Sequence, residues 1–589
     1  MRASGNLQIL RKSTSLPSVS EEIANPITGC DGQESADPGK LTCSQPLRCR
    51  ILVAREPLST MAIQSPGTPD QTAHAQNQTE VFAVHGADPE VLAYAMAKYS
   101  RSSLSMRQSL KEINSQRAEQ FLNTFYFQYG HRSIADLAHV AFAIERLSLL
   151  AAIVLVDEQR WDGQERSTRY QNFQKSGWYL PDFGAAEEMR KLYTGTVEDL
   201  FSTYTHTSAA VFEALKSRVV CPAEMKQDAY ERTLKARAFD VARYLLPLAT
   251  NTSLGQIVNA RTLETQVSRL LSHPAAEIRD LGEKLKLAAT GSAWNLNAEA
   301  AAALQARIAG FSSELATDSE PLLTREVHVA PTLVKYAQPN SYAQQTHLEL
   351  SLAAAELLTD TPIVSAPLVD LVECTESLEA ELAATLLYSA SHHSYRQIRN
   401  LVAALPEARI AEIIEIGLRH RGRHDEALRA FHAGATLRFD ILMDIGGFRD
   451  MHRHRRSTQI IQGFTHLHGY ETPESGDAAG LAEAGILSQY QAHVEAAFSA
   501  SRRIAESDAP EATQSALYLL PLATRIRSLF KMDFAEAQYI SELRSGPAGH
   551  FSYRKVAWEM YLAVQRKHPM LAKYFRVTDF TQPIDLLKR

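Results

Sequence analysis

The feature that most constrains this chain is a heptapeptide that occurs twice. Tyr-Leu-Leu-Pro-Leu-Ala-Thr fills positions 244–250 and returns at 518–524, an offset of 274 residues. Identity over seven residues is improbable by chance, and the offset suits a whole domain better than a solenoid repeat. We therefore predict an internal duplication. Arg243 precedes the first copy and Leu517 the second, so the two copies are expected to differ in chemistry.

The rest of the chain divides around this duplication. Residues 1–77 are rich in Ser, Pro, Gly, Gln and Thr without an apolar period, which predicts a disordered tail. The segment Glu-Val-Phe-Ala-Val at 80–84, with Asp88 and Pro89 after it, predicts a strand and then a helix. The same pattern at 369–379 marks the second copy. We predict a first domain over 78–310, a linker with connecting elements over 311–367 and a second domain over 368–589.

Apolar residues recur at helical spacing in both copies, for example at Ile410, Ile413, Ile414 and Leu418, and alternating stretches are few. Such stripes are typical of buried helix faces. The pattern predicts an α+β fold, mainly helical with a small β-sheet, that is present twice in tandem.

Composition excludes several classes of protein. A net charge of −6 gives no reason to expect nucleic acid or an anionic membrane as partner. The five cysteines form no C-x-x-C pair, so neither a disulfide scaffold nor a zinc site is predicted. The most apolar run, 149–156, is too short to cross a bilayer. With no apolar signal segment at the N-terminus, we expect a cytoplasmic protein.

The densest polar stretch of the first copy is Gln-Glu-Arg-Ser-Thr-Arg-Tyr at 164–170. If this segment is extended, Glu165, Ser167 and Arg169 project to one side, because side chains repeat every second residue. A guanidinium fork and a hydroxyl suit a phosphate. The alternative is a solvated polar turn, which the spacing taken alone favours.

The second copy carries a basic cluster, His-Arg-His-Arg-Arg-Ser at 452–457, followed by His466 and His468. Four histidines suggest a metal site, but the interleaved arginines oppose a cation and Asp450 is the only adjacent carboxylate. We predict no metal. Three arginines in four positions fit an anion such as a pyrophosphate, and the alternative is a basic solvated face.

These residues resemble the signature of the flavin-dependent thymidylate synthases, the ThyX family. Residues 165–170 resemble its E-x-S-x-R-Y end, and Arg453-His454-Arg455 resembles its R-H-R start. The resemblance covers roughly 80–300 and, more faintly, 369–575. Further matches follow the family order, namely His131, Arg243 before Leu-Pro, Asn259-Ala260-Arg261, Arg269 and His273.

The resemblance implies reductive methylation of dUMP to dTMP, with methylenetetrahydrofolate as carbon donor and NADPH as reductant of bound FAD. A flavin hydride, not a protein thiolate, then activates the pyrimidine, in keeping with a chain that has no obvious catalytic cysteine. For dUMP the implied contacts are Glu165, Ser167, Arg169, Tyr170, Arg243 and Arg269, with Arg269 also catalytic. For FAD they are Arg453, His454, Arg455, His131, Asn259, Arg261 and His273.

Neither copy carries the full set. Asp157-Glu158-Gln159 stand in the first copy where R-H-R is expected, and Ile461, Gly463 and Thr465 stand in the second where Glu, Ser and Arg are expected. We therefore predict a site shared between complementary domains, in a homodimer of tandem chains that forms a pseudo-tetramer. The alternatives are a catalytically degenerate homologue that binds flavin or a nucleotide, and a nucleic-acid-binding protein, which the acidic net charge opposes.

Overall fold

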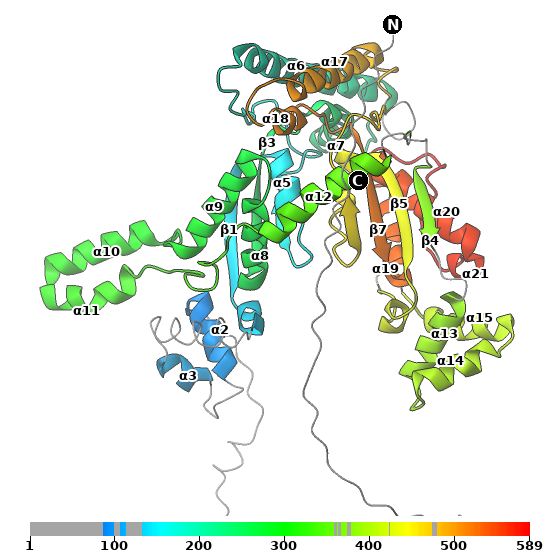
Figure 1. Ribbon diagram of the computed structural model, residues 1–589, viewed down its shortest axis with the longest axis horizontal. Coiled ribbons are helices and arrows are strands. Elements are labelled where there is room, and N and C mark those ends of the chain that lie inside the picture. The colour runs from blue at the N-terminus through cyan, green and yellow to red at the C-terminus, as the bar shows by residue number, and fades with distance from the viewer. Residues whose placement is uncertain are drawn as a thin grey trace, which may run out of the picture. The chain divides into compact units, whose positions relative to one another are not determined.

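Two antiparallel sheets, one in each half of the chain, frame the computed structural model (Figure 1). The first has the order β1-β3-β2 and the second the order β4-β5-β7-β6. Their strands are β1 (His139–Ser148), β2 (Asp162–Glu165), β3 (Asn251–Asn259), β4 (Val369–Glu373), β5 (Leu437–Asp444), β6 (Thr458–Ile461) and β7 (Arg525–Met532).

The structure describes residues 86–98, 106–112, 132–358, 362, 367–373, 378–422, 425–473 and 480–588. All of these belong to one compact unit that begins at Ala83. The predicted tail over 1–77, the predicted strand at 80–84 and His131 lie outside the described residues.

Helices make up most of the described chain, so the prediction of a mainly helical α+β protein is confirmed. The first half has α2 (Pro89–Lys98), α3 (Met106–Glu112), η2 (Arg132–Leu137), α5 (Leu149–Leu155), α6 (Glu187–Arg218), α7 (Gln227–Ala242), η3 (Arg243–Leu245), α8 (Ala260–Leu271) and α9 (Ala276–Thr290). Next come α10 (Ala298–Phe311), α11 (Ser313–Leu323) and α12 (Ser341–Leu358). The second half has α13 (Leu378–Ser389), α14 (Tyr395–Ala403), α15 (Glu407–Leu418), η4 (Arg429–His432), α16 (Ile445–Met451), α17 (Leu487–Ala505), α18 (Ala512–Leu517), α19 (Phe534–Ser545), α20 (Phe551–Lys567) and α21 (Pro569–Ala572).

Several local predictions agree with these elements. Helix α2 begins at Pro89, directly after Asp88. The apolar stripe of α15 faces the core through Ile413, Ile414 and Leu418. The predicted linker contains two helices, α11 and α12, and neither has a buried residue.

The order of elements repeats between the halves. The series β1-α5-β2, then β3-α8-α9, returns as β5-α16-β6, then β7-α19-α20. In each half the later long strand lies in the sheet between the earlier long strand and a four-residue strand. The short helix after the first long strand is capped by Ser148 in one copy and Asp444 in the other, whose side chains accept backbone N–H groups.

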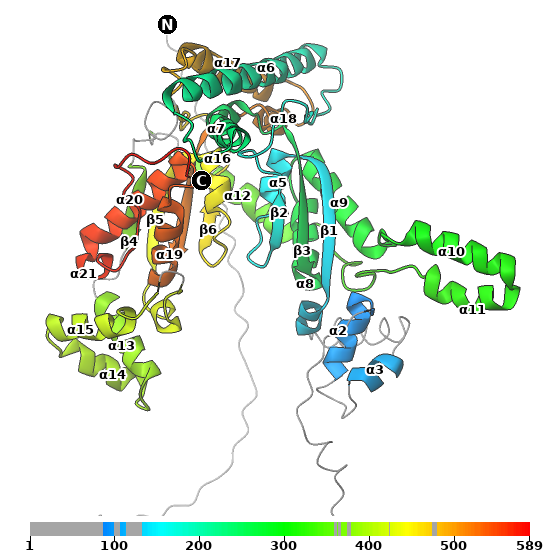
Figure 2. The same ribbon diagram turned by 180° about the vertical axis from the view of Figure 1, so that it is seen from behind.

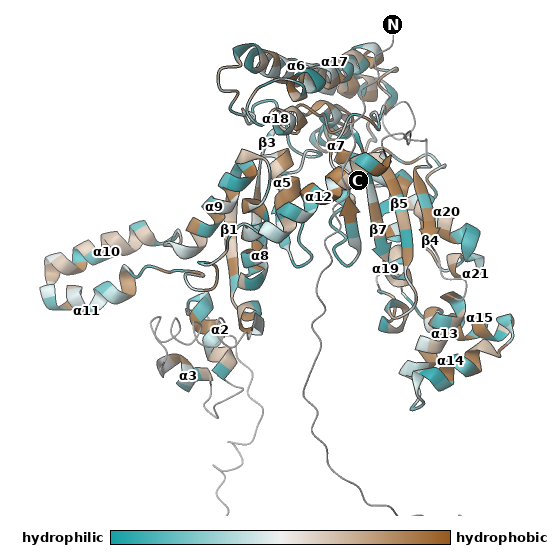
Figure 3. Cartoon of the chain, in the orientation of Figure 1, coloured by the Kyte–Doolittle hydropathy of each residue, from teal (hydrophilic) through white to brown (hydrophobic). Residues whose placement is uncertain are grey.

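The alternation of β5 shows why this strand forms. Leu437, Phe439 and Ile441 are buried, while Arg438 and Asp440 between them are partly exposed. Figure 3 displays the same mixture of apolar and polar residues along the strand. A period of two with one apolar face is what a sheet packed on one side requires.

The two heptapeptides pair with each other. Leu248 N donates to Leu520 O (2.9 Å) and Leu522 N donates to Leu246 O (2.9 Å), with an antiparallel bridge between Pro247 and Pro521. Because each copy meets the other in the same way, this contact has approximate two-fold symmetry. Helices α6 and α17 also pack against each other across the two halves (Figure 2). The same heptapeptide sequence therefore forms both sides of this interface between the halves.

Candidate functional site

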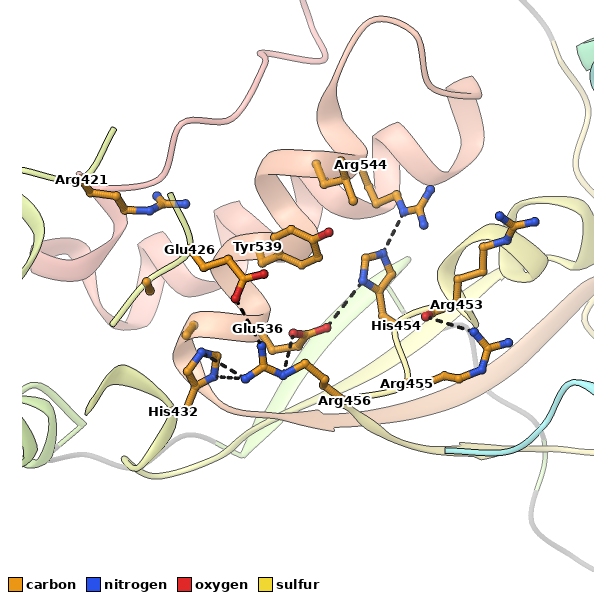
Figure 4. Close-up of a pocket in the computed structure, with 13 residues that line it drawn as sticks. Arg421, Glu426, His432, Arg453, His454, Arg455, Arg456, Glu536, Tyr539 and Arg544 are labelled. Carbon is orange, nitrogen blue, oxygen red and sulfur yellow. Dashed lines mark hydrogen bonds and ion pairs between the residues drawn. The ribbon is translucent and has the colours of Figure 1, made fainter. Parts of the chain in front are cut away.

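The basic cluster lies in the turn between α16 and β6 (Figure 4). The carbonyl of His454 accepts hydrogen bonds from Ser457 Oγ (2.6 Å) and Gln459 Nε2 (2.9 Å), which hold the turn in place. His454 is buried, whereas Arg453 and Arg456 are exposed. The turn thus exposes Arg453 and Arg456 and buries His454.

One cavity of about 270 Å³ lies between this turn and α19. His454 links its walls, because Arg544 Nε donates to His454 Nε2 (2.8 Å) and Nδ1 lies 3.5 Å from a Glu536 carboxylate oxygen. Burial lowers the pKa of His454, while the Glu536 hydrogen bond opposes the shift and Arg544 adds to it. The unprotonated Nε2 atom accepts the hydrogen bond from Arg544. Arginines outnumber carboxylates around the cavity, which is lined by Arg421, Arg453, Arg455, Arg456, Arg544, Glu426 and Glu536 among others.

A second cavity of about 480 Å³ lies between the two halves and shares Arg453, Arg455 and Arg456 with the first. The first half contributes Trp161 and Asn259 to its lining. The Arg455 guanidinium lies 4.5 Å from the centre of the Trp161 ring, a cation–π contact. Burial and the neighbouring Arg453 lower the pKa of Arg455, and its buried Nε has no hydrogen-bond partner. A bound anion would satisfy this group.

Arg243 is another arginine with unsatisfied donors. Its side chain is only 2% exposed, and its Nε and Nη2 atoms are buried without a hydrogen-bond partner. Its Nη1 lies 3.4 Å from Thr168 Oγ1 and 3.9 Å from Asp450 of the second half. Buried donors of this kind are costly and rare, so these two atoms call for a further acceptor.

The polar stretch of the first half bonds to the second half directly. Arg449 of α16 forms an ion pair with Glu165, and its Nη1 lies 3.5 Å from Thr168 Oγ1. Glu165, Arg449, Arg453 and Arg455 share the wall of a small cavity of about 30 Å³. The structure therefore brings Glu165 to the basic cluster.

Arg169 is enclosed by protein. Its Nε and Nη2 donate to the two oxygens of Asp240 (2.7 and 3.2 Å), and Nη1 donates to Tyr553 Oη (2.8 Å). Nη2 also donates to the carbonyl of Ala548 (3.1 Å). Burial alone would lower the pKa of Arg169, but the Asp240 carboxylate outweighs it and the pKa is raised. The two buried side chains thus form an ion pair at the junction of the halves.

Other predicted residues occupy separate places. Ser167 Oγ accepts from the Arg169 amide (3.2 Å), and Tyr170 is 55% exposed. Arg261 pairs with Asp136 (2.9 Å). His273 accepts from the Ala275 amide (3.0 Å) in the turn after α8, and burial, with Arg269 next, lowers its pKa to about 4. Arg261 and His273 therefore bond to residues of the first half, to which they themselves belong.

Arg269 pairs with Glu158, which follows α5. Its Nε and Nη2 donate to one Glu158 carboxylate oxygen (3.1 and 2.8 Å), and Nη1 donates to the carbonyl of Val154 (2.8 Å). Burial raises the pKa of Glu158, and Arg269 opposes that shift. Asn259 caps α8 by accepting the Thr262 amide (2.8 Å).

Sequence reasoning did not identify Trp161 or Arg449. Trp161 lies four residues before Glu165, and Arg449 four residues before Arg453. Neither residue belongs to a recognisable sequence motif. Their place at the site becomes evident only from their contacts with the opposite half, Trp161 with Arg455 and Arg449 with Glu165. Within the part of the chain that the structure describes, no group of three or more His, Cys, Asp or Glu side chains is placed to hold a metal. Among the same residues, no helix has the length and apolarity needed to cross a membrane.

Comparison with known proteins gives matches along both halves. The model of the family "Thymidylate synthase complementing protein" matches residues 82–289 and again 370–570. A UPF0159 protein of Chlamydia muridarum is 27% identical over 538 residues, 85% of this chain and 92% of the relative. A second, from Chlamydia pneumoniae, is 27% identical over 546 residues, 86% and 93% of the two chains. A flavin-dependent thymidylate synthase of Clostridium tetani is 22% identical over 200 residues, 34% of this chain and 76% of that enzyme.

Proposed function

Since this chain belongs to the family of thymidylate synthase complementing proteins, we propose that it is a flavin-dependent thymidylate synthase with a site built from both halves. The reaction is the reductive methylation of dUMP to dTMP, with methylenetetrahydrofolate and NADPH as co-substrates. Each half then has a ThyX-like fold, and two tandem chains associate as a pseudo-tetramer.

The observation that carries the proposal is the pair of unsatisfied buried arginines beside the junction of the halves. Arg455 comes from the second half and Arg243 from the first, and each has buried N–H groups without a partner. Guanidinium forks bind phosphate oxygens through charge-assisted hydrogen bonds. Two such groups fit a dinucleotide cofactor and a nucleotide substrate, each of which carries phosphate.

The lining residues fit FAD. Arg453, Arg455 and Arg456 face two adjoining cavities and would hold its diphosphate. When bound, FAD supplies the hydride for the reaction, so the protein needs no nucleophilic thiol. Arg243, with the Thr168 hydroxyl beside it, would bind the dUMP phosphate and orient the pyrimidine. The cation–π contact with Trp161 would hold the Arg455 guanidinium in position to bind this diphosphate.

A second candidate function is binding of flavin or nucleotide without turnover. The ion pair of Arg169 with Asp240 and that of Arg269 with Glu158 favour it, because both arginines are implied ligands of dUMP and both already have carboxylate partners. In this case the family fold keeps its cofactor site while the substrate contacts are filled by protein.

Absorption and turnover separate the two functions. The chain is mixed with FAD, desalted and examined for a flavin spectrum with and without dUMP, and tritium release from 5-tritiated dUMP reports turnover. Retained flavin whose spectrum shifts with dUMP, together with tritium release, supports the synthase. Retained flavin without tritium release supports the binding protein, and a colourless chain contradicts both.

Arg455→Ala tests the residue that carries the argument. Loss of one charge-assisted bond costs about 1.5–3 kcal/mol, so flavin affinity is expected to fall by roughly 10- to 150-fold. Arg190→Ala is the matched control, because Arg190 is an exposed arginine paired only with Glu187 three residues earlier. Equal flavin binding by both variants would exclude Arg455 from the site.

A further inference from the structure

The two halves place an arginine in corresponding helices and give it different partners. Arg269 lies in the last turn of α8 and Arg544 in the last turn of α19. Each reaches back to the segment that follows the short capped helix, where Arg269 meets Glu158 and Arg544 meets His454. Glu158 and His454 occupy equivalent places, because each lies seven residues before the last residue of the following strand, Glu165 or Ile461.

The difference in partner determines whether the positive charge of the arginine is neutralised within the protein or remains available to a ligand. Arg544 makes one bond to a neutral imidazole and lines the 270 Å³ cavity. Arg269 uses Nε, Nη1 and Nη2 on the Glu158 carboxylate and on the carbonyls of Val154 and Leu155. Arg269 therefore has its anionic partner within the protein, whereas Arg544 has a neutral partner and faces a cavity.

The residues on either side of Glu158 strengthen the contrast. Asp157 and Gln159 stand where the second half has Arg453 and Arg455. Asp157 is directed to the second half, since its carboxylate lies 3.6 Å from His452 Nε2. At these positions the first half thus lacks the two arginines that the second half offers to an anion.

We infer that Glu158 is a built-in anionic ligand that closes the first-half counterpart of the flavin site, so that each tandem chain binds a single FAD. This deepens the proposed function and rests on it for the identity of the ligand. The duplication, on this view, produced two potential cofactor sites, and a carboxylate from the chain itself occupies one of them.

Stoichiometry tests the inference directly. Isothermal titration of the full chain with FAD is expected to give one site per chain. The triple variant Asp157→Arg, Glu158→His, Gln159→Arg installs the second-half turn in the first half and is expected to bind two FAD per chain. Two sites in the unmodified chain, or one site in a triple variant that keeps the circular dichroism and Tm of the parent, would overturn the inference.

The reverse exchange keeps the test decisive if the triple variant does not fold. His454→Glu combined with Glu536→Thr gives the second half the Glu158 carboxylate and the Thr262 hydroxyl of the first. Arg544 should then pair with residue 454, and FAD affinity should fall at least about 10-fold, the loss expected for one charged hydrogen bond. Glu536→Thr alone measures the effect of removing that carboxylate, and the double variant should bind FAD more weakly than Glu536→Thr does. Unchanged affinity in the double variant would overturn the inference.

Failure of the inference and failure of the proposed function give different results. One FAD per chain without tritium release from dUMP contradicts the synthase and leaves the assignment of Glu158 intact. Two FAD per chain with turnover contradicts the assignment and leaves the synthase intact. Absence of binding for both FAD and inorganic pyrophosphate contradicts both.

Discussion

Replacing Arg169 with alanine should destabilise the whole chain, because Arg169 ties the two halves together. Its side chain and that of Asp240 are 9% and 3% exposed. Removal of the guanidinium leaves a buried carboxylate without its cation, together with an unpaired Tyr553 hydroxyl and Ala548 carbonyl. Breaking a buried ion pair by removing one partner costs about 3–5 kcal/mol. We expect a loss of about 4 kcal/mol in the free energy of unfolding.

A double-mutant cycle separates the pair from its surroundings. Arg169→Met with Asp240→Leu removes both charges and keeps apolar volume, and such replacements are often neutral. The double variant should therefore recover most of the stability that either single variant loses. Urea unfolding followed by circular dichroism gives the free energies, with the exposed pair of Arg190 and Glu187 as a control worth less than about 1 kcal/mol.

The same variants separate structure from ligand binding. If Arg169 serves only the ion pair, the double variant should bind dUMP as the parent does. If Arg169 also contacts dUMP, the stable double variant should lose affinity. An Arg169→Ala variant that loses less than about 1 kcal/mol of stability would refute the view that Arg169, through its ion pair with Asp240 and its hydrogen bonds to the second half, stabilises the junction.

Three further outcomes are expected. Burial raises the pKa of Asp444 to about 6, with the Ser552 hydrogen bond opposing the shift. Because the folded pKa lies above the unfolded one, the contribution of Asp444 to stability is most favourable below about pH 4 and declines by about 3 kcal/mol as pH rises through about 6. Asp444→Asn should flatten that dependence in urea unfolding, and an unchanged slope would contradict the shift. Gly163→Ala should lower the free energy of unfolding by about 1–3 kcal/mol and weaken flavin binding. A Cβ there would lie 2.4 Å from a β3 carbonyl oxygen and 2.5 Å from the Trp161 ring. A variant with the parental urea midpoint would show that the strand can shift. The two halves, expressed as separate chains divided between α11 and α12, should co-purify, since each buries its heptapeptide against the other. Soluble halves that do not bind each other would contradict this.

The general fold could be predicted because its signals are local. Ser, Asp or Asn at helix starts, the stripe of α15 and the alternation of β5 depend on neighbours in the sequence. The duplication also appears in the sequence, because the two heptapeptides meet across an approximate two-fold axis and are subject to the same packing requirements. Predicted site residues such as Arg169 and Arg269 instead bond to partners that are distant in the sequence, Asp240 and Glu158, which local patterns do not reveal.

The sequence by itself determined the duplicated, mainly helical fold, the family and the place of the basic cluster, because each depends on residue order and local spacing. Only the tertiary structure decided which arginines have free donors. Arg169 meets Asp240 across 71 residues and Arg269 meets Glu158 across 111, whereas Arg243 and Arg455 keep buried N–H groups unsatisfied. All four are equally charged in the sequence, and the difference arises because burial removes the water that would otherwise serve every one of them.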